Sequence, residues 1–212
     1  LTPDGQIEAQ SDRTELGQGA EESHRIVISD ILGIEKKDVL IPLVTSDIIG
    51  MGPVSSRGSV YPLSALAVAV KKLKAKVIQY AAHYFETDAQ DISMKDGRIF
   101  STRDPEKTMT YRELARRVYF LPGPKSLPME MKTGSDFLPE VQATWFSPNT
   151  AENPSSTYTT FCHSADIVVV ELDIETGVVK ILKMTHVHDA GKIINKYLVD
   201  GQIHGGVAQG LG

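Results

Sequence analysis

Thr14-Glu15-Leu16-Gly17-Gln18-Gly19 follows a strand-like segment over residues 6–13 and leads directly into a predicted helix over residues 20–32. Gly17 and Gly19 permit positive φ angles and let a ligand approach the backbone closely. Gln18 offers both a hydrogen-bond donor and an acceptor. The helix supplies free N–H groups and the positive end of its dipole. The loop is therefore suited to a small anionic or heterocyclic group, although a Gly-x-Gly turn alone more often only joins two elements.

A second loop, residues 45–57, repeats this arrangement. It follows a predicted strand over residues 39–44, in which Pro42 favours an edge or a bulge. It leads into the longest predicted helix, residues 60–85. Backbone N–H groups and the two hydroxyls around Ser55 and Ser56 are suited to a phosphate, and Arg57 adds a positive charge. The alternative, that Ser55 or Ser56 caps the helix, is slightly favoured by spacing alone.

Four lysines lie in the middle of that long helix: Lys71, Lys72, Lys74 and Lys76. A solvated face is the preferred interpretation, and a phosphate-binding patch is the alternative.

The middle of the chain alternates short elements with loops. We predict a hairpin over residues 91–101, a capping box at Thr110-Tyr111-Arg112-Glu113 before a helix ending near Tyr119, and a break at Pro122-Gly123-Pro124. Long loops with one strand near Val141–Phe146 are expected next. An antiparallel hairpin then pairs residues 165–173 with 178–187, around a turn at Glu175-Thr176-Gly177. The last helix is expected over residues 197–211.

These elements predict an α/β (α+β) fold with mixed sheets and strand–glycine loop–helix units, in two parts over residues 1–134 and 135–212.

The last helix carries an unusual number of glycines. Gln202 and Gln209 are seven residues apart and share one helical face, while Gly205 and Gly206 keep the helix thin. Glycine costs helix stability, so this pattern indicates close approach by a neighbour or ligand. Tight helix–helix packing is the alternative explanation.

His186-x-His188-Asp189 resembles half a metal site, because alternate residues of a strand point the same way. No further ligand is obvious, so a polar strand end is the preferred interpretation.

Composition restricts the function classes. The net charge of −5 argues against nucleic acid or an anionic membrane as the main partner. The one cysteine, Cys162, excludes an internal disulfide and any cysteine-based zinc or iron–sulfur site. A reducing, cytoplasmic compartment fits best. Both ends look cut, so we expect a segment of a larger protein; a small domain with frayed ends is the alternative.

Four stretches resemble the molybdopterin-binding large subunit of the xanthine dehydrogenase and aldehyde oxidase family. They are Thr14–Gly19, Gly52-Pro53-Val54-Ser55-Ser56-Arg57, the hairpin around residues 170–177, and residues 189–212, including Gly201-Gln202-Ile203-His204-Gly205-Gly206. Their order and spacing match over nearly the whole chain, and the last stretch is the most specific. Lys196 stands where the family usually has proline, and Ser55 replaces a common alanine. Neither departure blocks cofactor contact.

The resemblance implies a molybdopterin cofactor contacted by two groups of residues, Gly17, Gln18, Gly19, Ser55, Ser56 and Arg57 in the first part and Gln202 and Gln209 in the second. It implies hydroxylation of an aldehyde or N-heterocycle with water as oxygen source, and iron–sulfur clusters and FAD on partner subunits or domains of an oligomer. The pterin holds the metal, so no protein metal ligand is expected.

The resemblance also sets what this chain lacks. The family's catalytic glutamate lies in a Gly-Glu motif expected beyond Gly212, so no catalytic residue is assigned here. We expect the 212 residues alone to be inactive and to bind the cofactor poorly. The alternative function is a non-catalytic cofactor-binding or assembly module of the same family.

Overall fold

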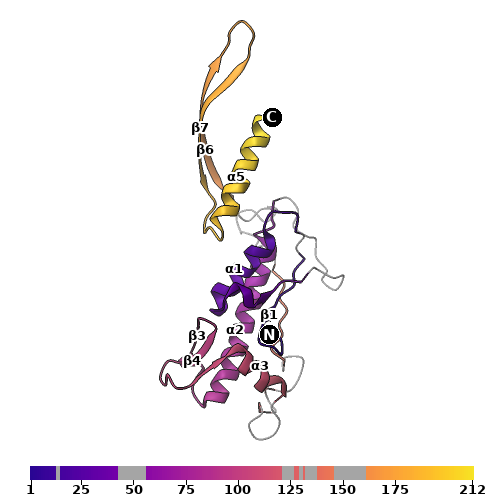
Figure 1. Cartoon of the computed structure of the whole chain (residues 1–212), viewed down its shortest axis with the longest axis vertical. Helices are drawn as coiled ribbons and strands as arrows, with labels where there is room; N and C mark the ends of the chain where they lie inside the picture. Colours follow the sequence, from indigo (N-terminus) through magenta and orange to yellow (C-terminus); the bar gives the residue numbers. More distant parts are fainter. Residues whose placement is uncertain (13–14, 43–55, 121–126, 129–130, 132–137, 146–160) are drawn as a thin grey trace, which may run out of the picture. The chain divides into compact units, whose positions relative to one another are not determined.

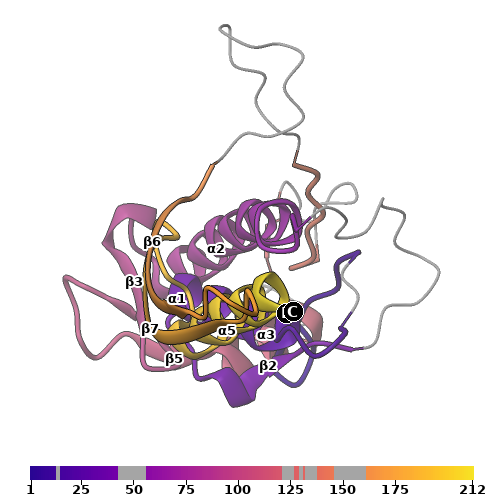
Figure 2. The same ribbon diagram turned by 90° about the horizontal axis from the view of Figure 1, so that it is seen from above.

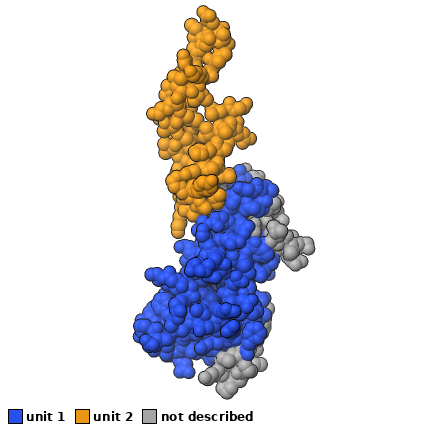
Figure 3. All heavy atoms as spheres, viewed as in Figure 1, with its two compact units in different colours: residues 1–146 blue, residues 147–212 orange. Residues whose placement is uncertain are grey.

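The computed structural model describes the chain apart from residues 13–14, 43–55, 121–126, 129–130, 132–137 and 146–160. The chain divides into two compact units, unit 1 over Leu1–Phe146 and unit 2 over Ser147–Gly212, which Figure 3 colours separately. Helices occur together with small parallel and antiparallel sheets, so the predicted α/β (α+β) class is confirmed. The boundary predicted near residue 134 lies outside the described residues and stays a prediction.

Unit 1 contains three helices among its described residues, with short strands and 3-10 turns between them (Figure 1). The elements are β1 (Ile7–Glu8), α1 (Ala20–Leu32), η1 (Lys36–Asp38), β2 (Val39–Leu40), α2 (Tyr61–Phe85), η2 (Ala89–Asp91), β3 (Ile92–Lys95), β4 (Arg98–Ser101), β5 (Thr108–Thr110) and α3 (Tyr111–Phe120).

Helices α1 and α2 lie side by side and form the centre of the unit 1 core, as both views show (Figures 1 and 2). Ile28 and Leu32 of α1 and Val77 of α2 are fully buried. Burying one such side chain stabilises the fold by about 1.5–3 kcal/mol relative to leaving it exposed. The predicted bounds of both helices are confirmed, because local signals set them. Gly33, for example, ends α1 in the left-handed conformation, and its N–H donates to Ser29 O.

Strands β1 and β2 hold the two ends of the first strand–glycine loop–helix unit. They pair in parallel, with Ile7 opposite Val39 and Glu8 opposite Leu40. Ile7 and Val39 are buried beneath α1 in the same core. Each described strand is only two residues long, shorter than predicted from the apolar runs. The unit therefore relies on helix packing more than on sheet hydrogen bonds.

The predicted hairpin over residues 91–101 is confirmed as β3 and β4. Asp96 and Gly97 at its turn have φ angles of 50° and 73°, as a two-residue type I′ turn requires. A third strand, β5, pairs with β4 and was not predicted. It leads directly into α3, where the buried Tyr111 hydroxyl donates to Leu32 O at 2.6 Å. This hydrogen bond joins α3 to the end of α1.

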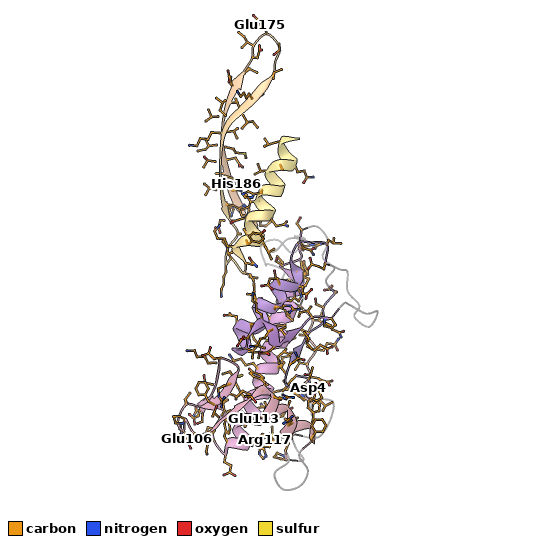
Figure 4. The ribbon with its side chains drawn as sticks, in the orientation of Figure 1. Asp4, Glu106, Glu113, Arg117, Glu175 and His186 are labelled. Carbon is orange, nitrogen blue, oxygen red and sulfur yellow. The ribbon has the colours of Figure 1, made fainter. Side chains whose placement is uncertain are left out.

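The predicted capping box at the start of α3 is confirmed in both directions. The Glu113 N–H donates to Thr110 Oγ1 at 3.1 Å, and the Thr110 N–H donates to Glu113 Oε2 at 2.7 Å. Hydrogen bonds from the Thr110 backbone and hydroxyl lower the pKa of the Glu113 carboxyl below its ordinary value of 4.5. Figure 4 shows Glu113 on α3, one turn before Arg117.

Glu113→Gln is therefore expected to lower the free energy of unfolding by less than about 1 kcal/mol at pH 7, because the glutamine amide oxygen can still accept from Thr110 and only the added strength of a charged acceptor is lost. A lowered folded-state pKa stabilises the fold fully above pH 4.5, and this contribution is lost as the pH falls through the folded-state value. Urea unfolding should show a larger difference between the variant and the wild type at pH 7 than at pH 3. Glu106→Gln, at an exposed residue of the β4–β5 connection, is the matched control. Equal losses at both pH values would contradict the assignment.

The lysines on α2 lie on an accessible face, with Lys71 and Lys72 exposed and Lys74 and Lys76 half-buried, and three of them also donate to backbone carbonyls. Lys72 donates to Gln142 O at 3.3 Å, Lys74 to Ile31 O at 2.9 Å, and Lys76 to Glu140 O at 2.8 Å. Residues 141–145 form no strand, contrary to the prediction for Val141–Phe146; residue 146 lies outside the description. The carbonyls of Glu140 and Gln142 thus accept from lysines of a distant helix, which holds this part of the chain without a strand partner.

Unit 2 consists, in its described part, of one long hairpin and one helix. The elements are β6 (His163–Leu172), β7 (Val179–Asp189) and α5 (Lys196–Leu211). The hairpin and the last helix were both predicted and are confirmed. Figure 1 shows α5 beside the half of the hairpin farthest from its turn. Consecutive apolar residues, Ile167 to Val170, place exposed side chains on both faces of the hairpin.

Candidate cofactor-binding site

The first glycine loop is closed by its own acidic residue. Gly17 and Gly19 have φ angles of 97° and 76°, which confirms the need for glycine at both positions. The Glu15 carboxylate accepts three backbone N–H groups: Oε1 accepts from Gly17 at 3.0 Å and Gly19 at 3.1 Å, and Oε2 accepts from Glu21 at 2.9 Å. The loop thus enters α1 with its amides already paired.

This pairing corrects one sequence expectation. The N–H groups at the start of the helix were expected to be free for a small anionic or heterocyclic group, and those of Gly17, Gly19 and Glu21 are occupied by Glu15. Sequence reasoning assigned no role to Glu15. The signal was available: a carboxylate two residues before a Gly-x-Gly turn at a helix start can accept the unpaired N–H groups of the first turn.

Gln18 has a defined amide orientation. The Leu16 N–H donates to Gln18 Oε1 at 2.6 Å, and an N–H donor can pair only with the oxygen end of the amide. A Cβ added at Gly17 would meet nothing within 4 Å, so the backbone beside Gln18 is open to close approach.

The second loop contributes Ser56 and Arg57 to the description, while Ser55 lies outside the described residues. Ser56 has a φ angle of 58°, which is uncommon for serine. The N-cap of α2 is Val60, and no side chain caps it, so the interpretation of Ser56 as the helix cap was wrong. The residue instead turns the backbone immediately before Arg57.

Arg57 is held by an aromatic stack at the start of α2. Its guanidinium carbon lies 5.1 Å from the centre of the Tyr61 ring, within the range of a cation–π interaction. Tyr61 in turn meets Trp145 edge to face, with ring centres 5.2 Å apart. A positive group with a restricted position thus stands at the end of the second loop, as a phosphate or carbonyl contact requires.

In unit 2, α5 places Gln202 and Gln209 on one face, as the spacing predicts. Asn195 caps the helix by accepting from the Leu198 N–H at 3.3 Å. At 100° per residue, Gln202, Gly205 and Gln209 fall within one narrow sector. A Cβ added at Gly205, or at the neighbouring Gly201 and Gly206, would meet nothing within 4 Å. Within the described chain, packing therefore does not explain these glycines.

The opposite face of α5 meets β7 across a groove of about 630 Å³. Val199, Ile203 and Val207 supply apolar lining from the helix, and His186 and His188 line it from β7. Figure 4 shows His186 on the side of β7 that faces α5. The helix thus has one face that contacts the hairpin and another, carrying the glutamines, that no described residue covers.

The two histidines of β7 are paired with protein groups. His186 Nδ1 lies 2.7 Å from Asp166 Oδ1, and the His186 and His188 rings stack with centres 5.5 Å apart. No group of three or more potential metal-ligating side chains occurs among the residues that the structure describes. No helix in this part of the chain is long and apolar enough to cross a membrane.

The glycine loop at a helix start and the open, glutamine-bearing helix define a cofactor-binding α/β segment. The family model of the molybdopterin cofactor-binding domain matches residues 1–212, and the chain therefore belongs to that family.

Curated relatives share this segment. The chain is 30% identical to the carbon monoxide dehydrogenase large chain of Afipia carboxidovorans, over 99% of this chain and 24% of the relative. It is also 30% identical to a putative xanthine dehydrogenase molybdenum-binding subunit of Escherichia coli, over 100% of this chain and 26% of the relative. The chain thus spans about a quarter of the length of the curated relatives it matches.

A solved structure of a related enzyme has a similar fold over nearly all of this chain. Quinoline 2-oxidoreductase from Pseudomonas putida 86 superimposes with a TM-score of 0.77 and 27% identity, over 99% of this chain and 25% of that chain. The expected family and fold are confirmed by these matches. None of them tests the individual site residues, which stay predictions.

Proposed function

We propose that this chain is the cofactor-binding segment of a molybdenum hydroxylase, and that it contacts molybdopterin through both units. The observation that carries the proposal is the open face of α5, where Gln202 and Gln209 flank Gly205. The contact residues are Gly17, Gln18, Gly19, Ser55, Ser56 and Arg57 from unit 1 and Gln202 and Gln209 from unit 2.

The chemistry of these residues fits the cofactor. A pterin edge carries both donors and acceptors, which glutamine amides match, and a phosphate suits the guanidinium of Arg57. The glycine positions let the flat ring system approach the helix backbone. When bound, the cofactor supplies the redox chemistry and holds the metal itself. The protein residues then bind and orient it.

The proposed reaction is hydroxylation of an aldehyde or nitrogen heterocycle with water as oxygen source. Relatives named for xanthine and nicotine, and the quinoline enzyme among the solved structures, support a heterocyclic substrate. Relatives named as large chains or subunits support partner subunits, to which we assign the iron–sulfur clusters and FAD in an oligomeric complex. The single cysteine, Cys162, supports a cytoplasmic location.

The test uses the full-length protein that contains this segment, purified with its partner subunits. Gln202→Leu combined with Gln209→Leu is expected to weaken cofactor binding about 30-fold, the effect of losing two hydrogen bonds of about 1 kcal/mol each, and so to lower the bound molybdenum. Metal analysis measures the content, and oxidation of aldehydes and N-heterocycles with an artificial electron acceptor measures turnover.

Gln90→Leu, at an exposed glutamine of η2, is the matched control and should retain the metal. Wild-type protein without molybdenum after expression in a cofactor-competent host would contradict the proposal. Molybdenum without any turnover would instead indicate the non-catalytic cofactor-binding module.

A further inference from the structure

The contacts of Glu15 show what the first loop can and cannot bind. Its two carboxylate oxygens accept all three of the N–H groups at Gly17, Gly19 and Glu21. Two further carboxylates, Glu21 and Glu22, lie in the first turn of α1. An anionic group placed at these amides would meet the Glu15 carboxylate and be repelled by it. The loop is therefore already filled where an anion would bind.

We propose that Glu15 is a positioning residue that fixes the loop conformation around Gln18, the residue proposed to contact the cofactor. This inference rests on the proposed function, in which Gln18 contacts molybdopterin. Glu15 itself touches no cofactor atom. It acts through Gln18, whose two neighbours in the chain are both held by Glu15 Oε1.

The physical reason is the freedom of the two glycines. Gly17 and Gly19 both adopt positive φ angles, and glycine populates many other conformations at little cost. Without a fixed partner, the backbone around Gln18 would sample these alternatives, and its amide would point in several directions. Three hydrogen bonds to one carboxylate select a single loop conformation. The Leu16 N–H in turn donates to the oxygen of the Gln18 amide.

Substitutions at Glu15 and Glu22 distinguish the effect of losing the hydrogen bonds that fix the loop from the effect of losing a negative charge. Glu15→Gln keeps one carbonyl oxygen, which can accept either the two glycine N–H groups or that of Glu21, and it turns an NH₂ donor toward the remaining N–H. Glu15→Asp keeps both oxygens on a shorter side chain, which can still accept from the residue two positions on. Glu22→Gln is the matched control: it removes the same charge near the start of α1, at a carboxylate that pairs with Lys36.

Two readouts on the full-length protein test the proposal. In cofactor-free protein, hydrogen exchange at the amides of residues 17–21 should become about tenfold faster in Glu15→Gln, intermediate in Glu15→Asp and unchanged in Glu22→Gln. In the loaded protein, the electron paramagnetic resonance spectrum of reduced molybdenum should change in Glu15→Gln as it does in Gln18→Leu. The double variant should show no further change, because both substitutions withdraw the same amide.

Unchanged exchange in Glu15→Gln would overturn the proposal, and so would a spectrum that differs from wild type only in Gln18→Leu. Increased molybdenum retention in Glu15→Gln would overturn it too, since it would mean that the carboxylate competes with a cofactor anion. These failures differ from failure of the proposed function. In that case the wild-type protein itself would hold no molybdenum, whatever residue occupies position 15.

Discussion

Gly205→Leu is expected to remove most of the molybdenum from the full-length protein while leaving the folding of this chain intact or slightly improved. The open face of α5 has room for a side chain in the described structure, since a Cβ at Gly205 meets nothing within 4 Å. Replacing a helical glycine by leucine should stabilise the helix by about 0.5–1 kcal/mol. If the cofactor occupies that face, the same side chain displaces it.

The expected loss of affinity is about 5- to 150-fold, which corresponds to the cost of about 1–3 kcal/mol for overpacking a close contact. Metal analysis of the full-length variant measures the loss, and thermal unfolding followed by circular dichroism measures the stability. Ala208→Leu adds similar bulk on the groove face of α5 and serves as the control. Wild-type molybdenum content in Gly205→Leu would show that the cofactor does not approach this face.

Gly5→Ala is expected to lower the free energy of unfolding by about 2–5 kcal/mol, the combined cost of a left-handed alanine and a steric overlap. Gly5 has a φ angle of 87°, and an added Cβ would lie 2.4 Å from Arg112 Cα and 2.5 Å from Arg112 N. Both atoms belong to the backbone of α3 and have little freedom to move. Figure 4 shows the neighbouring Asp4 beside α3.

Gly97→Ala measures the cost of the left-handed backbone conformation without the cost of steric overlap. Gly97 also has a positive φ angle, 73°, but a Cβ there meets nothing within 4 Å. Its replacement should cost about 1–2 kcal/mol from the backbone conformation alone. Urea unfolding of the two variants in parallel measures the difference. Equal destabilisation would mean that α3 yields to the added methyl group and that the contact at Gly5 is not tight.

The elements predicted correctly from the sequence are those whose ends are marked by nearby residues, such as a cap or a turn. Gly33 ends α1, the Asp96-Gly97 turn forms the β3–β4 hairpin, and Thr110 with Glu113 starts α3. Each signal acts within about four residues, so a sequence pattern contains it completely. Strand β5 was missed because three residues are too short for an alternating pattern to appear.

The errors involve partners far away in the sequence. The segment after Leu138 contains apolar residues typical of a strand, but its carbonyls accept from Lys72 and Lys76, more than sixty residues earlier. The buried Tyr111 hydroxyl likewise donates a hydrogen bond to the distant Leu32 O. Desolvation raises the pKa of this hydroxyl. No local pattern in the sequence shows which carbonyl a lysine or tyrosine will reach.

The candidate site was predictable in part for the same reason. The glycines at 17 and 19 and the shared face of Gln202 and Gln209 follow from backbone rules, and the structure shows both. The role of Glu15 required knowledge of where its carboxylate folds back. Contacts to a cofactor depend on a molecule outside the chain, so the site assignments stay predictions.

The two apolar faces of the β6–β7 hairpin leave its strand register unusually dependent on polar groups. A strand with one buried face resists a one-residue slip, because the slip would turn every apolar side chain outward. Here a slip would exchange one apolar face for another. The Asp173 carboxylate fixes the turn by accepting from Glu175 and Thr176, and the irregularity between Val169 and Val170 fixes the offset of the strands beyond it. In this register Asp166 lies opposite His186, to which it is hydrogen-bonded, and Glu171 lies opposite Lys180, so polar pairs, more than apolar alternation, determine the pairing.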